Sequence, residues 1–154
     1  MSALLAACGG FLLAVLWMDL IFDTQVLGKP REDGALPESV LASIAAYYRR
    51  ATTDSYPMSR LIAAVMGVAV LGSAVALFAG SGALLLRLLA LTLVVGPAAL
   101  ARVRVVPNAV RLGARSDDLA TQTSLARAIC RDHLVCLAGV SAFVAVELAL
   151  ASSS

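Results

Sequence analysis

The stretch ALLAACGGFLLAVLWM, residues 3–18, carries no charged side chain and is followed by DLIFDTQVL, residues 19–27. An α-helix needs about 20 predominantly apolar residues to cross the hydrocarbon core of a bilayer. Asp19 and Asp23 are the only charges within this run. Residues 3–27 are therefore predicted to form a membrane-spanning helix with two carboxylates near its second end.

The rest of the chain continues this pattern. Of its 154 residues, 60% are hydrophobic and 14% are charged, and its mean hydropathy is +0.90. Soluble domains carry about 25% charged residues. Three further spans are predicted at residues 59–80, 83–106 and 132–151. We expect a single all-α domain over residues 1–154, an integral membrane four-helix bundle.

The basic residues indicate how this bundle lies in the membrane. An even number of spans places both termini on one side, and only Arg87 lies near that side. The other basic residues flank the two remaining loops: Lys29, Arg31, Arg49, Arg50, Arg60, Arg102, Arg104, Arg111, Arg115, Arg127 and Arg131. Because basic loops stay in the cytoplasm, loops 28–57 and 107–131 are predicted to be cytoplasmic and both termini outside. A bacterial inner membrane is the expected location.

The first loop contains a predicted amphipathic helix. Between Pro37 and Arg50, the residues Leu41, Ile44, Ala45 and Tyr48 recur at helical spacing and share one face. Such a helix either lies in the inner membrane interface or covers the bundle. Both alternatives stay open.

Small residues at intervals of four predict close helix contacts, because they let helix backbones approach in lipid. They are Gly10, Ala14, Gly72, Ala76, Gly80, Ala138 and Ala142. Packing within one bundle is the favoured interpretation, and a homodimer seam is the alternative. The bilayer is the expected partner, and a homo-oligomer or a larger membrane complex stays open. The small net charge of +2, with arginines scattered among acids, argues against nucleic acid.

Asp19 and Asp23 are the strongest candidates for chemistry. Charge inside a membrane is costly, and residues four apart lie on one helix face. Polar side chains from spans three and four are predicted at the same depth: Arg102, Asn108, Arg111 and His133. Together they predict a polar pocket at the cytoplasmic end that could take a small hydrophobic or aromatic ligand. The alternative is that the arginines reach lipid headgroups and the aspartates only brace the bundle.

Two further predictions concern ions. Arg87 and Glu147 lie at matching depths near the outer face, which predicts a structural ion pair. Two carboxylates and one histidine could hold a divalent ion, but the chain has no second histidine and no metal-type cysteine spacing. No metal and no cofactor is predicted.

Three short segments resemble the anthrone-oxygenase-like family of four-helix membrane proteins. These are Tyr56-Pro57-Met58, the segment VPNAVR at residues 106–111, and His133 followed by apolar residues. The resemblance implies cofactor-independent oxygenation of an electron-rich aromatic substrate. His133 would be the base, Asn108 and Arg111 would steady an oxyanion, and Asp19 or Asp23 would set the histidine tautomer.

Whether the chain is an enzyme stays open from sequence. The alternatives to an oxygenase-like oxidoreductase are a non-catalytic accessory or assembly subunit of a membrane complex and, third, an ion-binding or transport module. A four-span chain offers little room for a transport pathway unless it oligomerises.

Overall fold

The computed structural model describes residues 1–28, 34–79 and 83–152, and these form helices and short connections without a β-strand. The elements are α1 (Ser2–Asp23), η1 (Thr24–Leu27), α2 (Glu38–Arg49), η2 (Arg50–Asp54), α3 (Tyr56–Ala79), α4 (Leu84–Leu100), η3 (Ala101–Val105), α5 (Val106–Ala114) and α6 (Leu119–Ser152). The predicted all-α bundle is confirmed. Lys29, Arg31 and Gly80 lie outside the described residues.

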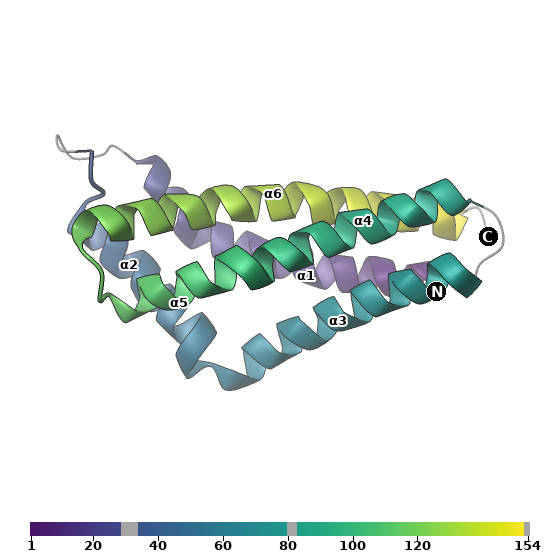
Figure 1. The fold of residues 1–154 in the computed structure, drawn as a ribbon, viewed down its shortest axis with the longest axis horizontal. Coiled ribbons are helices and arrows are strands. Elements are labelled where there is room, and N and C mark those ends of the chain that lie inside the picture. The colour runs from purple at the N-terminus through teal and green to yellow at the C-terminus, as the bar shows by residue number, and fades with distance from the viewer. Residues whose placement is uncertain (29–33, 80–82, 153–154) are drawn as a thin grey trace.

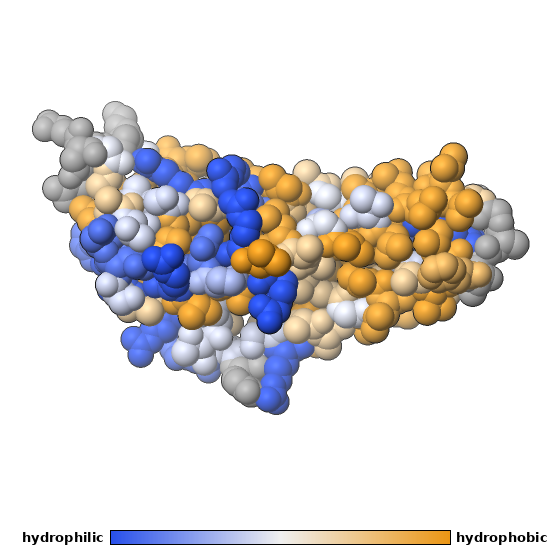
Figure 2. All heavy atoms as spheres, in the orientation of Figure 1, coloured by the Kyte–Doolittle hydropathy of each residue, from blue (hydrophilic) through white to orange (hydrophobic). Residues whose placement is uncertain are grey.

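Four helical stretches are long and apolar enough to cross a membrane: Ser2–Leu27, Pro57–Phe78, Leu84–Ala114 and Leu119–Ser152. They run side by side, with both termini at one end and α2 and α5 at the other (Figure 1). We call these the outer end and the inner end. Figure 2 shows hydrophobic residues covering the outer part of the visible face, whereas hydrophilic residues gather toward the inner end.

The third connection is much shorter than the predicted loop 107–131. Helix α5 follows α4 through the π-helical segment η3. Helix α6 already begins at Leu119, so only Arg115–Asp118 connects α5 to α6. At about 1.5 Å per residue, the 34 residues of α6 measure about 51 Å, well beyond a hydrocarbon core of about 30 Å. Helix α6 is therefore longer than the thickness of a hydrocarbon core.

Helix α2 closes the inner end. Its predicted stripe of Leu41, Ile44, Ala45 and Tyr48 is at most 3% exposed and packs on residues of α5 and α6, including Leu112 and Ile129. A Cβ on Gly113 of α5 would come within 2.9 Å of the backbone nitrogen of Arg49, so the two helices touch closely. Of the two alternatives for this helix, these contacts favour a cover over the bundle.

Within the outer part of the bundle, glycines mark the closest contacts. A Cβ on Gly72 would come within 2.7 Å of Leu5, which places this predicted small residue in the α1–α3 contact. A Cβ on Gly9 would lie 2.5 Å from Cγ2 of Val144, whereas one on the neighbouring Gly10 would meet nothing within 4 Å. The face of α1 that packs closely against α6 is therefore the face of Gly9. The predicted pair Gly10 and Ala14 is exposed.

These two neighbouring glycines provide a matched test of the packing. We expect Gly9→Leu to lower the free energy of unfolding by about 1–3 kcal/mol, because the side chain must enter the α1–α6 contact. Gly10→Leu should be neutral or slightly stabilising, since leucine favours a helix more than glycine does. Thermal unfolding of both variants in the same detergent compares them. Equal losses would contradict the assigned rotation of α1.

Candidate functional site

The inner end holds a cluster of buried polar side chains where α1, α2 and α6 meet. Asp19 and Asp23 lie one turn apart near the end of α1, and His133 lies on the facing side of α6. From the outer ends of their helices, Asp23 and His133 both lie about 30 Å inward at 1.5 Å per residue. A hydrocarbon core is about 30 Å thick, so both side chains lie about one core thickness from the outer helix ends. Tyr47 and Tyr48 of α2 complete what we call the inner cluster: Asp19, Asp23, Tyr47, Tyr48 and His133.

Asp23 is the centre of the inner cluster. Its side chain is fully buried, and its Oδ2 lies 2.6 Å from Nδ1 of His133. Its Oδ1 accepts a hydrogen bond from the Tyr48 hydroxyl at 2.5 Å. An ionised carboxylate can only accept, so the tautomer that fits an Asp23 carboxylate is the one with the proton on Nδ1. Asp23 thereby orients the ring and leaves Nε2 as the nitrogen whose protonation can change.

Asp19 forms the accessible edge of the inner cluster. It accepts a hydrogen bond from the Tyr47 hydroxyl at 2.6 Å, and its Oδ2 lies 3.7 Å from Nε2 of His133. This last distance is too long for a direct hydrogen bond. The Asp19 side chain is 15% exposed, whereas that of His133 is 6% exposed. Asp19 is therefore the more accessible of the two side chains.

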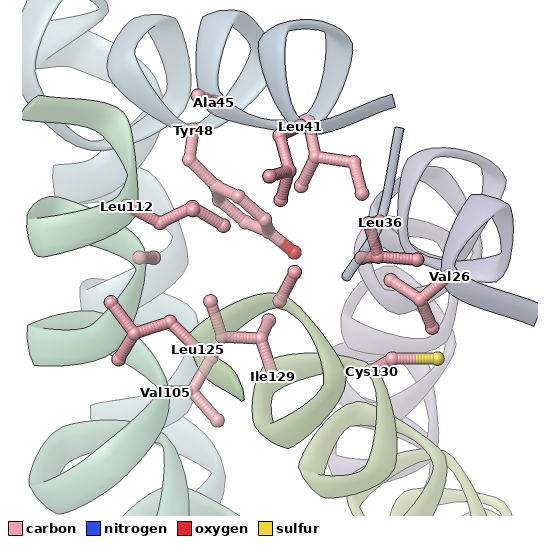
Figure 3. Close-up of a cluster of buried hydrophobic side chains, with 13 residues drawn as sticks. Val26, Leu36, Leu41, Ala45, Tyr48, Val105, Leu112, Leu125, Ile129 and Cys130 are labelled. Atoms are coloured by element: carbon pink, nitrogen blue, oxygen red, sulfur yellow. The ribbon is translucent and has the colours of Figure 1, made fainter. Parts of the chain in front are cut away.

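Aromatic and aliphatic side chains surround these polar groups. The rings of Phe22 and Tyr47 stack at 4.1 Å with an angle of 9°, and Tyr47 meets Tyr48 edge-on at 5.2 Å. Figure 3 shows Tyr48 pointing away from α2 into a group of apolar side chains that includes Leu112 and Ile129. Such a cover excludes water, and hydrogen bonds to charged groups are stronger where water is excluded.

A further buried carboxylate, that of Asp132, lies outside the inner cluster. Asp132 is buried, and its carboxylate lies 3.2 Å from Nη2 of Arg104 and 3.3 Å from Nε of Arg131. Both arginines come from the basic set predicted to flank the third loop. Since Asp132 has two cationic partners of its own, it is an anchor between η3 and α6.

The remaining predicted pocket residues are not part of the inner cluster. Arg111 lies on the exposed side of α5 and pairs with Asp117 at 2.8 Å, and Arg102 is exposed. Asn108 is half-buried, and within the described part of the chain it makes no hydrogen bond to Asp19, Asp23 or His133. The structure therefore brings together the predicted acids and base, but not the predicted oxyanion donors. Arg87 and Glu147 lie at the opposite, outer end, where both line one cavity.

The two tyrosines are members that the sequence reasoning missed. Tyr48 belongs to the predicted apolar stripe of α2, and a buried tyrosine hydroxyl usually has a hydrogen-bond partner. That requirement was a usable signal, because the nearest intramembrane acceptors are the two aspartates. Within the described residues, no group of three or more His, Cys, Asp or Glu side chains is arranged to hold a metal ion.

Ionisation of the tyrosines is opposed by their surroundings. Burial and the hydrogen bond to Asp19 raise the pKa of Tyr47, and burial and the charge of Asp23 raise the pKa of Tyr48. Both hydroxyls are therefore donors rather than anions over the physiological range. In the unfolded chain a tyrosine releases its proton at a pKa of about 10.

A pH dependence of stability follows from the raised pKa of both tyrosines. Above about pH 10 the unfolded state binds fewer protons than the native state, so stability should fall as the pH rises further. Below about pH 10 the two tyrosines make their full contribution to the free energy of unfolding. We expect the thermal midpoint of the wild type to drop more steeply between pH 9 and 11 than that of the Tyr47→Phe, Tyr48→Phe double variant. Parallel curves would contradict the buried hydroxyls.

Comparison of the chain with protein-family models, with curated proteins and with solved structures gave no match. The function is therefore argued from the geometry of the inner cluster.

Proposed function

We propose that this integral membrane protein uses the inner cluster as an acid–base site for a lipophilic phenolic substrate, in the manner of a cofactor-independent oxygenase. The observation that carries the proposal is the 2.6 Å contact between Asp23 and Nδ1 of His133. A buried carboxylate on one imidazole nitrogen fixes the tautomer and raises the basicity of the other nitrogen. The pair of Nε2 and Asp19 is then the proton acceptor.

The proposed reaction is a net oxygenation of an activated methylene group. The base removes a C–H or phenolic proton, and the resulting delocalised carbanion gives electrons to dioxygen. One oxygen atom becomes the new carbonyl and the other leaves as water, so an anthrone plus O₂ gives an anthraquinone plus H₂O. Positioned donors stabilise the negative charge that develops on the substrate oxygen. Tyr47 is the nearest candidate, because its hydroxyl, which donates to Asp19, can turn to the substrate oxygen once Asp19 has taken up the proton.

The lipid phase is the proposed route of entry. Trp17, Met18 and Ile21 surround Asp19 in the sequence of α1 and are 65%, 52% and 53% exposed. These apolar side chains would face lipid, and tryptophan favours the depth of the membrane interface. A planar aromatic substrate dissolved in the bilayer could then reach Asp19 beside the stacked pair Phe22 and Tyr47.

The proposed orientation places the inner end in the cytoplasm of a bacterial cell and both termini outside. Its support is the basic residues of the inner end, among them Arg104, Arg111 and Arg131. Basic residues next to a span favour the cytoplasmic side.

A second candidate is a non-catalytic module in which the inner cluster only locks helices together. The observation in its favour is that Asp23 joins α1 to α2 through Tyr48 and to α6 through His133. Such a lock would serve an accessory or assembly subunit equally well. Its loss should change stability without changing any reaction.

Oxygen uptake distinguishes the two candidates. Detergent-purified protein is mixed with anthrone and with a panel of related phenols, and oxygen consumption is followed with an electrode together with quinone formation. The enzyme proposal predicts uptake above the spontaneous rate, with one quinone formed per dioxygen. Uptake no faster than without protein across the whole panel would favour the structural module.

A further inference from the structure

The inner end contains a cavity that the proposed function does not use. It has a volume of about 600 Å³ and lies between the first part of α6 and the segment that leads into α2. Gly34, Ala35, Thr123, Ser124, Arg127 and Arg131 are among its lining residues. Pockets of roughly 300–1,000 Å³ are the size at which proteins bind small molecules.

Two hydrogen bonds hold the walls of this cavity together. The backbone N–H of Leu36 donates to Oγ1 of Thr123 at 3.2 Å, and Nη2 of Arg127 donates to the carbonyl oxygen of Gly34 at 3.0 Å. Thr123 is only 5% exposed, and a hydroxyl that accepts one hydrogen bond can still donate its own proton. The segment before α2 is therefore fixed against α6, and the cavity between them is part of the fold.

The cavity carries an excess of positive charge. Arg127 and Arg131 are four residues apart and share one face of α6, and none of the described lining residues is acidic. Asp132 is shared between Arg104 and Arg131, so one negative charge faces two positive charges. The hydrogen bond of Arg127 goes to an uncharged carbonyl oxygen. The cavity therefore favours an anion.

The two guanidinium groups define the class of anion. A guanidinium has five N–H donors. Within the described part of the chain, Arg127 uses Nη2 on Gly34 and Arg131 uses Nε on Asp132, which leaves further donors on each. Guanidinium groups pair with phosphate oxygens through parallel hydrogen bonds, and the exposed Ser124 hydroxyl adds another donor. A phosphate group has enough oxygens to accept from both arginines at once.

The exposed surface beside the cavity matches the rest of a phospholipid. Leu134, Val135 and Ala138 follow Arg131 by three, four and seven residues toward the outer end, so they continue the same face of α6. Leu134 and Val135 are 46% and 56% exposed. This face presents arginines and then apolar side chains, the order in which a phospholipid presents its phosphate and its acyl chains. We propose that the cavity binds the phosphate group of an anionic phospholipid, with Arg127 and Arg131 as its partners.

Native mass spectrometry of the detergent-purified chain tests this proposal with defined lipids. Phosphatidylglycerol should be retained at one molecule per chain and more strongly than phosphatidylcholine, whose choline cancels the charge of its phosphate. Arg127→Gln should weaken retention of phosphatidylglycerol by about fivefold, the usual contribution of one basic residue near an anionic headgroup. Arg131→Gln is a second, independent variant with the same expected loss. Arg111→Gln, the same substitution at an exposed arginine outside the cavity, should retain the lipid as the wild type does.

Competition shows whether the acyl chains contribute to binding. Displacement of phosphatidylglycerol by soluble glycerol 3-phosphate supports a phosphate site that also takes the free compound, and persistence of the lipid supports a site specific for the membrane form. Helical content and elution volume show whether each variant is folded. Equal retention of both lipids by the folded wild type, or the same retention by the folded cavity variants as by Arg111→Gln, would overturn the proposal.

Discussion

Replacement of Asp23 by asparagine is expected to lower the free energy of unfolding by about 3 kcal/mol, because removing one partner of a buried ion pair leaves the other uncompensated. Asp23 is fully buried and accepts hydrogen bonds from both Tyr48 and His133. An amide has nearly the same shape, but its NH₂ group must face one of these donors. The measurement is equilibrium unfolding in mixed detergent micelles, followed by helical content.

An exposed aspartate supplies the matched control for this experiment. Asp54 lies 3.7 Å from Nε of Arg49, and its side chain is 53% exposed. Exposed ion pairs contribute little, so Asp54→Asn should change stability by less than about 1 kcal/mol. Asp19→Asn should fall between the two, since Asp19 is partly exposed and accepts one hydrogen bond. Similar small losses for Asp23 and Asp54 would contradict the assigned centre of the inner cluster.

Replacement of His133 is expected to have the largest effect on activity. General base catalysis contributes about 10²–10⁴-fold, so His133→Ala should reduce oxygen uptake with an anthrone by that factor. His133→Gln should behave similarly, which separates the loss of the base from the loss of side-chain volume. Tyr47→Phe should retain part of the activity, because its hydroxyl is proposed to stabilise charge but not to accept the proton. The rates of all variants are compared at equal amounts of folded protein.

The same series separates an enzyme from a structural module. Asp54→Asn should retain the wild-type rate, because Asp54 lies on the exposed inner surface. If His133→Gln lowers the unfolding free energy but leaves oxygen uptake unchanged, the inner cluster is a structural lock. If it removes uptake and the protein stays folded, the acid–base site is supported.

The sequence predicts the bundle well because its signals are local. A charge-free run of helical length, as in residues 3–18, has few alternatives to a membrane span. The stripe of Leu41, Ile44, Ala45 and Tyr48 predicts both the helix α2 and its buried face. Asp19 and Asp23 are costly in an apolar run, so their partnership with His133 follows from the same physical principle.

Some predicted pocket residues lie outside the inner cluster because of how their helices are rotated. Sequence spacing alone does not determine this rotation. Arg111 precedes the buried Leu112 by one residue, and each residue turns an α-helix by about 100°. The π-helical segment Ala101–Val105 lies ahead of both and changes the phase of every residue that follows. The charges in residues 107–131 predict a loop there. In the structure α6 already begins at Leu119, and its apolar residues Leu125 and Ile129 pack against α2.

Nuclear magnetic resonance of the single histidine tests the central claim most directly, because a sample labelled with ¹⁵N-histidine contains signals from His133 alone. We predict that Nδ1 carries a slowly exchanging, hydrogen-bonded proton at every pH at which the protein is folded. Nε2 should gain and lose its proton reversibly, and Asp23→Asn should abolish the protection of the Nδ1 proton. A bare Nδ1 with a permanently protonated Nε2, or a ring that exchanges as freely as histidine in water, would contradict the account.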